Sequence, residues 1–127
     1  LPSERELDMS RTAYAYVPRR CQPTRHRSNV TINVTGVLAC PLHIVYHGCS
    51  SSADVLRMAI VENAGFNEWA ESSSLIVLYP QTRGYACWDW DGQQTARPTT
   101  LFDTRQSPQM NTVNRMADGF LREVELG

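Results

Sequence analysis

The 127-residue sequence lacks lysine, long apolar runs and an excess of charge of either sign. Its twelve basic residues, all arginine, are balanced by thirteen acidic ones, so no overall field favours nucleic acid or an anionic membrane surface. No apolar run approaches the roughly 20 residues that a membrane-spanning helix needs. The length suggests one domain. We therefore expect a single segment over 1–127 whose partners include neither nucleic acid nor membrane.

The first ten residues, LPSERELDMS, also lack an initiator methionine and the basic and apolar regions of a signal peptide. We interpret the chain as processed, either after secretion or from a larger precursor. Residues 1–11 are charged and aperiodic, which predicts an extended lead-in.

Cysteine is scarce but even in number, and no pair has Cys-x-x-Cys spacing. This pattern disfavours a zinc site and favours two disulfides, for which three pairings are possible. We expect no metal and no other cofactor. The four residues are Cys21, Cys40, Cys49 and Cys87.

The polar segment 19–39 contains two glycosylation sequons, at Asn29 and Asn33. It predicts a glycosylated surface loop and hence a secreted, extracellular protein. The same segment is rich in arginine, so a patch that binds heparin or another polyanion is a less favoured alternative. The arginines are Arg19, Arg20, Arg25 and Arg27.

Hydrophobic patterning predicts strands at 12–18, 41–47 and 74–80, the last two buried on both faces. Helices are expected over 52–72, capped by Ser52 and broken near 63–65, and over 108–124 after a Ser107 cap. Alternating strands and helices predict a parallel α/β layout. With so few strands, the sheet should belong to a larger one completed by another chain. Residues expected in the core at helical spacing are Met58, Trp69, Met110, Val113, Met116, Ala117, Phe120, Leu121 and Val124.

The strand at 41–47 ends in His47-Gly48 and is followed by a turn of small residues and a helix. Such a turn leaves backbone N–H groups unpaired, and glycine lets a substrate oxygen approach them closely, as in half of an oxyanion hole. No Gly-x-Ser-x-Gly nucleophile motif occurs, and the nearest approach, residues 48–52, lacks the second glycine. Ser50 is therefore disfavoured as a nucleophile, and the chain cannot contain a complete serine triad.

Other polar residues have simpler interpretations. His43 and His47 would lie about 13 Å apart along a strand, too far to share a metal, and are expected to be packed or hydrogen-bonded. The paired carboxylates Asp89 and Asp91 alternate with two tryptophans, which allows glycosidase chemistry or sugar binding. Loop packing around a disulfide is the favoured interpretation.

Five blocks of the chain, from about residue 12 to residue 121, are AYVPRRC, ACPLHIVYHGCSSSADV, AGFNEWAESSSLIVLYPQ, ACWDWDG and SPQMNTVNRMADGFL. In this order they resemble the C-terminal part of extracellular poly(3-hydroxybutyrate) depolymerases and related esterases. The resemblance implies the C-terminal part of a circularly permuted α/β-hydrolase, with a parallel sheet and flanking helices. In that family the catalytic Ser, Asp and His precede the segment seen here.

The resemblance also implies roles for individual residues. The backbone N–H of Cys49 would be an oxyanion donor, with His47 and Gly48 shaping the turn, and Trp88 would line the substrate crevice. Cys49 would bridge to Cys87, and Cys21 to Cys40. Ser51 departs from the family, because many relatives carry glutamine there.

Two functions follow. The favoured one is one chain of a processed, secreted, serine-type carboxylic-ester hydrolase, whose Ser, Asp and His lie on a second polypeptide from the same precursor. The alternative is a non-catalytic secreted structural, matrix or binding protein that reuses the hydrolase scaffold. A glycan- or heparin-binding module is a third, weaker possibility.

Overall fold

The structure, a computed structural model, describes residues 4–22, 40–96 and 98–126. The sequons at Asn29 and Asn33 and the arginines at 25 and 27 lie outside these ranges. In chain order the elements are α1 (Glu4–Leu7), β1 (Tyr14–Tyr16), the 3₁₀ turn η1 (Arg19–Cys21), β2 (Leu42–Ile44), α2 (Ala53–Leu56), α3 (Ala59–Asn63), α4 (Phe66–Ser73), β3 (Ile76–Tyr79) and α5 (Pro108–Leu126).

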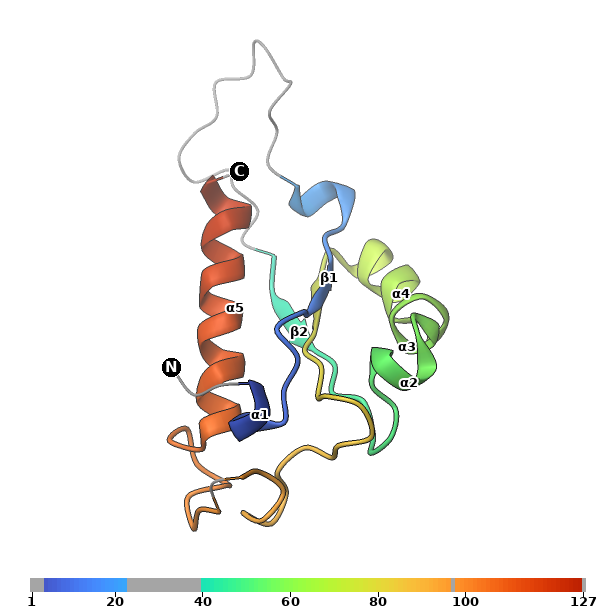
Figure 1. Ribbon diagram of the computed structural model, residues 1–127. Helices are drawn as coiled ribbons and strands as arrows, with labels where there is room; N and C mark the ends of the chain where they lie inside the picture. Colours follow the sequence, from blue (N-terminus) through green and yellow to red (C-terminus); the bar gives the residue numbers. More distant parts are fainter. Residues whose placement is uncertain (1–3, 23–39, 97, 127) are drawn as a thin grey trace.

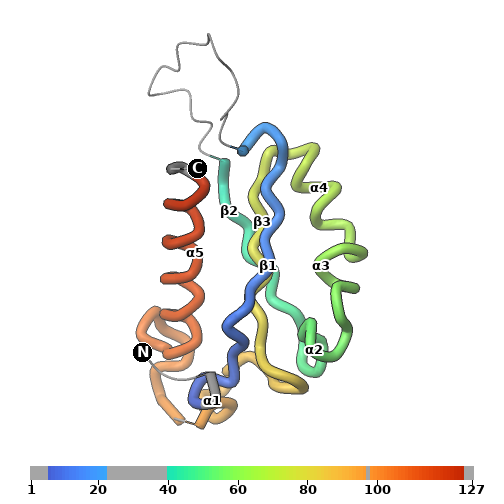
Figure 2. The backbone as a smooth tube through the Cα atoms, turned by 45° about the horizontal axis from the view of Figure 1, so that its top comes forward, coloured from blue at the N-terminus to red at the C-terminus, as the bar shows by residue number. Residues whose placement is uncertain are grey.

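The strands form a small sheet in the order β1-β3-β2, with α5 on one side and α2, α3 and α4 on the other (Figures 1 and 2). β2 runs parallel to β3, as expected for two strands joined through helices. β1 runs antiparallel to β3, so the sheet is mixed and the prediction of a wholly parallel sheet is wrong. A strand's hydrophobic pattern has the same period in either direction, which is why it could not reveal the orientation of β1.

β3 is the centre of the fold, and all four of its residues are buried, which confirms the predicted strand at 74–80. Val77 and Tyr79 pack in one cluster with Val61 of α3 and Ala70 of α4. A second cluster, which includes residues of α5, consists of Leu7, Met9 and Val113, with Ile44, Trp88 and Met116 packed against it. The sheet therefore has an apolar cluster on each face.

β2 is shorter and less buried than predicted, because His43 is exposed and its neighbours Leu42 and Ile44 are only partly buried. Ile76 N donates to Pro41 O and Val45 N donates to Leu78 O, so the backbone groups of residues 41 and 45 face β3. Backbone N–H and C=O groups alternate in direction along a parallel strand, so those of His43 also face β3. The peptide groups of Leu42 and Ile44 then point away from β3, where no further strand lies in the part of the chain that the structure describes. β2 is thus an open edge.

The helical stretch predicted over 52–72 consists of three short helices rather than two. The break at Gly65, with φ of 86°, is confirmed. An additional break occurs at Arg57, whose φ of 56° and ψ of −131° end α2. Ser52 precedes α2, but its hydroxyl donates to Gly84 O at 2.7 Å instead of capping the helix.

The lead-in over 1–11 is not extended throughout, because residues 4–7 form α1. Leu7 and Met9 are buried, and Met9 pairs with Thr82 in an antiparallel bridge. Gln109 fastens this segment to α5 by donating its side-chain N–H to Leu7 O at 2.7 Å. The two apolar residues thus anchor an otherwise charged segment against α5.

The predicted core is confirmed at Val113 and Ala117, which are buried, and at Met58 and Met116, which pack against the two clusters. It is wrong at Trp69, which is 44% exposed, and at Met110, which is 39% exposed. Helical spacing assigns a residue to a broad face, but it does not fix how completely neighbouring elements cover each position on that face. Phe120, Leu121 and Val124 are partly buried.

Candidate active site

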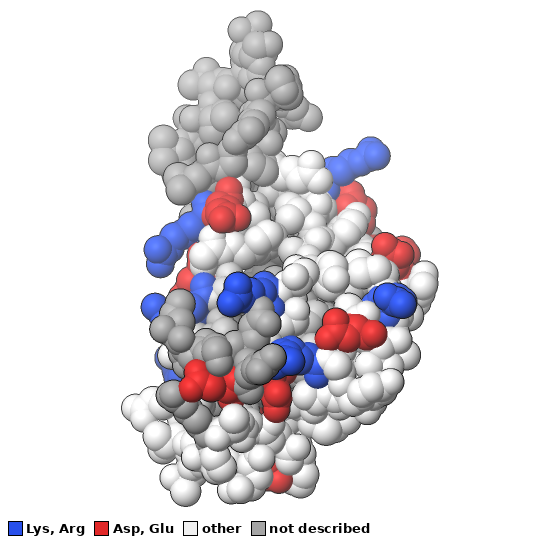
Figure 3. All heavy atoms as spheres, in the orientation of Figure 1, with Lys and Arg blue, Asp and Glu red and all other residues white. Residues whose placement is uncertain are grey.

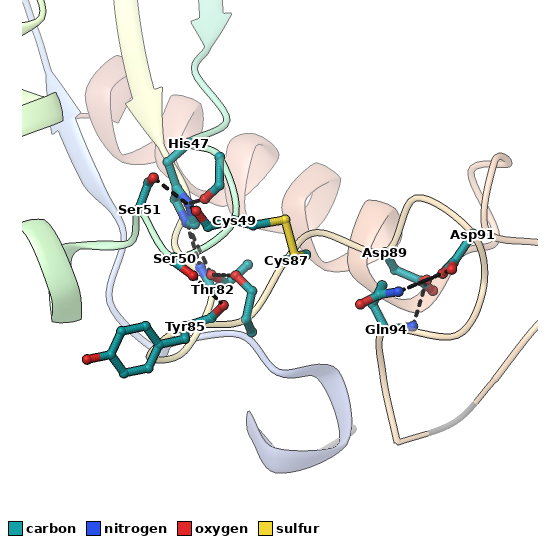
Figure 4. The surroundings of a disulfide bond; sticks show 12 residues. His47, Cys49, Ser50, Ser51, Thr82, Tyr85, Cys87, Asp89, Asp91 and Gln94 are labelled. Atoms are coloured by element: carbon teal, nitrogen blue, oxygen red, sulfur yellow. Dashed lines mark hydrogen bonds between the residues drawn. A yellow bond between two sulfur atoms is a disulfide. The ribbon is translucent and has the colours of Figure 1, made fainter.

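The chain that leaves β2 forms a tight turn at Gly48-Cys49-Ser50-Ser51, drawn in Figure 4. The turn is closed by a hydrogen bond of 3.2 Å from the N–H of Ser51 to the carbonyl oxygen of Gly48. Ser50, at the third position, has a φ of 57°, the positive value that a type II turn requires there. The turn sits at the molecular surface, with residues 48–50 exposed.

The outward side of this turn carries unpaired backbone donors. Among the residues that the structure describes, the N–H groups of Cys49 and Ser50 meet no acceptor. A Cβ placed on Gly48 would contact only the Ser51 hydroxyl, at 3.7 Å, so the surroundings of Gly48 are open. The arrangement can therefore receive an oxygen that carries developing negative charge.

Disulfides link Cys49 to Cys87 and Cys21 to Cys40, the pairing that the resemblance implies. The first joins the turn to the segment that follows β3, with 4.2 Å between the two Cα atoms (Figure 4). Further hydrogen bonds hold that segment against the start of α2. Gly84 N donates to the carboxylate of Asp54 at 2.7 Å, and Ala53 N donates to the side-chain oxygen of Gln81 at 2.7 Å.

His47 is buried beneath the turn, with 6% of its surface exposed. Its Nδ1 lies 2.7 Å from Gly48 O, and its Nε2 lies 3.1 Å from the backbone nitrogen of Thr82. The hydroxyl of Thr82 lies 3.3 Å from the same Nε2 and donates to Ala86 O at 3.0 Å. The prediction that His47 is hydrogen-bonded is confirmed.

Trp88 lies beside the turn and is partly buried. Its ring contacts Tyr46 edge-on, with 4.9 Å between centroids, and His47 at 5.4 Å. Its indole Nε1 is buried without a hydrogen-bond partner within the described ranges. Partial burial next to Trp88 raises the pKa of the Tyr46 phenol above its ordinary value.

The two carboxylates after Trp88 hold a loop together, as favoured from the sequence. Asp91 accepts from Gln93 N at 3.0 Å and from the side-chain nitrogen of Gln94 at 3.1 Å. Asp89 accepts from Gln94 N at 3.2 Å (Figure 4). The tryptophans do not form a common platform, because Trp90 is 68% exposed while Trp88 is partly buried.

The remaining candidates show no site. His43 contacts the rings of Trp69, at 5.2 Å between centroids, and Phe66. In the described ranges no cluster of three or more His, Cys, Asp or Glu side chains is placed to hold a metal. None of the helices described there has the length and apolar character to cross a bilayer. On the face in Figure 3, basic and acidic side chains of the described residues are interspersed.

Sequence reasoning missed Thr82 and Gln81, which connect the turn to the end of β3. Both are buried polar residues. The available signal was their position, because they directly follow the buried strand and Pro80 at the edge where the His47 turn also emerges.

No family model matches the chain. In sequence, it is 34% identical over 113 residues to a poly(3-hydroxybutyrate) depolymerase of Delftia acidovorans, covering 87% of this chain and 20% of that protein. It is 26% identical over 128 residues to a polyhydroxybutyrate depolymerase of Talaromyces funiculosus, covering 88% and 34%.

Solved structures of poly(3-hydroxybutyrate) depolymerases are also similar. That of the Penicillium funiculosum enzyme has a TM-score of 0.63 and 27% identity, over 84% of this chain and 33% of the other. A depolymerase variant complexed with an R3HB trimer has a TM-score of 0.63 and 25% identity, over 89% and 36%.

These similarities confirm the resemblance: the chain is similar, in sequence and in fold, to part of the poly(3-hydroxybutyrate) depolymerases. It spans about a fifth to a third of the length of the relatives it matches. Its mixed sheet with helices on both sides is compatible with an α/β-hydrolase fold.

Proposed function

We propose that the chain is part of a secreted, serine-type carboxylic-ester hydrolase of the polyhydroxyalkanoate-depolymerase type. It would supply the oxyanion donor, Cys49 N–H, and a crevice residue, Trp88. The Ser, Asp and His would lie outside residues 1–127, on a second polypeptide from the same precursor. The observation that carries the proposal is the exposed turn whose Cys49 N–H has no acceptor among the described residues while its flanks are fastened by a disulfide and by His47.

The chemistry is acyl transfer. The serine oxygen attacks the ester carbonyl, the alcohol leaves, and water hydrolyses the acyl-enzyme. Negative charge develops on the carbonyl oxygen in each tetrahedral intermediate, and a preorganised N–H stabilises it. Loss of one such donor typically lowers kcat by about 10²–10³-fold. Because the donor is a backbone group, any residue type except proline could supply it at position 49, and the cysteine serves to hold it in place.

The open edge of β2 is where the complementary part would join. The nucleophile must lie close enough to Cys49 for both to contact one carbonyl group, and β2 leads directly into that turn. Parallel strands are rarely left at an uncovered edge, and the outward peptide groups of Leu42 and Ile44 offer a ready pairing surface.

The substrate we propose is an ester of a short hydroxyalkanoic acid, either oligomeric or polymeric. The solved relative that binds an R3HB trimer supports this class. Trp88 offers an apolar ring next to the turn, within 5.4 Å of the His47 ring between centroids, which suits the alkyl part of such an ester.

The test uses the native protein, isolated with every polypeptide that accompanies it. Its mass is measured before and after denaturation and reduction, and it is treated with a fluorophosphonate probe and with an R3HB trimer. The proposal predicts that the trimer is hydrolysed and that the probe labels a serine outside residues 1–127. The absence of both hydrolysis and labelling would overturn it, as would a label on Ser50, Ser51 or Ser52.

The absence of a Gly-x-Ser-x-Gly motif in this sequence also fits a non-catalytic secreted scaffold. The precursor distinguishes the two functions, because a lost nucleophile elbow, Asp or His would favour the scaffold. Secretion has its own test. Removal of N-linked glycans from the native protein should lower the mass of peptides that contain Asn29 or Asn33.

A further inference from the structure

We propose that His47 is a positioning residue for the oxyanion donor. It holds the Gly48–Cys49 peptide by its carbonyl oxygen, so that the N–H of the same peptide faces outward. This inference rests on the proposed function and assigns a specific task to a buried side chain that need not touch the substrate.

The argument begins with one peptide group. The carbonyl oxygen of Gly48 and the N–H of Cys49 belong to the same planar unit and point in opposite directions. That oxygen lies within hydrogen-bond distance of two donors, His47 Nδ1 at 2.7 Å and Ser51 N at 3.2 Å. Rotation of the peptide would break both hydrogen bonds. The bonds to Gly48 O therefore fix the direction of the Cys49 N–H.

The disulfide does not do this by itself. It fastens the side chain of Cys49 to Cys87, but the peptide that precedes Cys49 could still rotate about its flanking backbone dihedrals. Hydrogen bonds to the carbonyl also polarise the peptide, which makes its N–H a stronger donor. Orientation and donor strength therefore both depend on His47.

Thr82 determines which ring nitrogen of His47 carries the proton. A backbone N–H can only donate, so Thr82 N, at 3.1 Å, requires an unprotonated Nε2. In a neutral imidazole the proton is then on Nδ1, which is the atom that faces Gly48 O. The Thr82 hydroxyl donates to Ala86 O and so leaves this assignment unchanged. The end of β3 thus selects the tautomer that the turn needs.

Burial makes the arrangement specific to this ring. His47 is covered by Trp88, so water cannot readily replace either hydrogen bond. His43, four residues earlier, provides a contrast, because it is exposed on β2 and has only ring contacts with Phe66 and Trp69.

Two substitutions in the native protein separate the two bonds. His47→Asn places an amide N–H near the position of Nδ1 and loses the acceptor for Thr82. His47→Gln places an amide oxygen near Nε2 and loses the donor to Gly48. We expect kcat on a short ester to fall about 10–100-fold for H47Q, with KM nearly unchanged, and less than about fivefold for H47N. H43Q and H43N are the matched controls, with kcat unchanged.

A second measurement does not require activity. Long-range ¹H–¹⁵N correlation spectra of the imidazole should show Nδ1 protonated and Nε2 unprotonated at neutral pH. If no ester is hydrolysed but this tautomer is found, the proposed function fails while the hydrogen-bond arrangement stands. If hydrolysis occurs and H47Q matches H47N or the wild type, or if Nε2 carries the proton, the positioning role is overturned.

Discussion

Removing the two disulfides one at a time should separate stability from catalysis. The double substitution Cys49→Ala/Cys87→Ala frees the oxyanion turn from the segment after β3. The matched control, Cys21→Ala/Cys40→Ala, removes the disulfide that joins the end of η1 to the segment before β2. Each variant loses one cross-link and leaves no free thiol behind, and the whole native protein is used.

The expected losses of stability are similar. The cysteines are 38 residues apart in the Cys49–Cys87 loop and 19 apart in the other. The chain-entropy relation gives about 4 kcal/mol for the longer loop and about 3 kcal/mol for the shorter one. Both losses are large against a typical stability of about 5–15 kcal/mol, but they differ from each other by only about 1 kcal/mol.

The catalytic effects should differ strongly. Without the Cys49–Cys87 bridge the donor peptide is held only by hydrogen bonds, and we expect kcat to fall about 10–100-fold, part of the 10²–10³-fold value of a complete donor. The control pair should keep kcat within about twofold. Urea unfolding measures the free energy of unfolding, and ester hydrolysis is measured well below each variant's melting temperature. Equal losses of kcat in both pairs, or none in the Cys49–Cys87 pair, would refute the reasoning.

Two further predictions concern the scaffold and are read from thermal or urea unfolding. Ser74 ends α4 in the left-handed conformation, with φ of 55°, so Ser74→Gly should stabilise the protein by about 0.5–1 kcal/mol. Ser73→Gly, one residue earlier and inside the helix, should instead destabilise it by about 0.5 kcal/mol, and equal effects would contradict the assignment. Gly92 has a φ of 80°, and a Cβ there would overlap the carbonyl oxygen of Thr99. Gly92→Ala should therefore cost about 3 kcal/mol, and a neutral result would show that the loop can rearrange freely.

Much of the local structure could be predicted from the sequence. The apolar run at 74–80 predicts a buried strand, and the structure contains the fully buried β3 there. The helix break predicted near Gly65 is also present in the structure. The resemblance implied the two disulfide pairings, which spacing left open. The errors occur where a residue's surroundings decide its state. Trp69 and Met110 fit an apolar face but lie exposed, and α1 forms where a charged segment was expected to be extended.

By itself, the sequence determined that the chain has strands, helices and a His-Gly turn, and that it has no Gly-x-Ser-x-Gly motif, because those properties depend on neighbouring residue types. Only the tertiary structure decided which way β1 runs and that β2 is an open edge. It alone also brought Thr82 to His47 and so placed the ring proton toward Gly48 O. These are relations between segments about 35 residues or more apart, and neither hydrophobic period nor local propensity carries information over that distance.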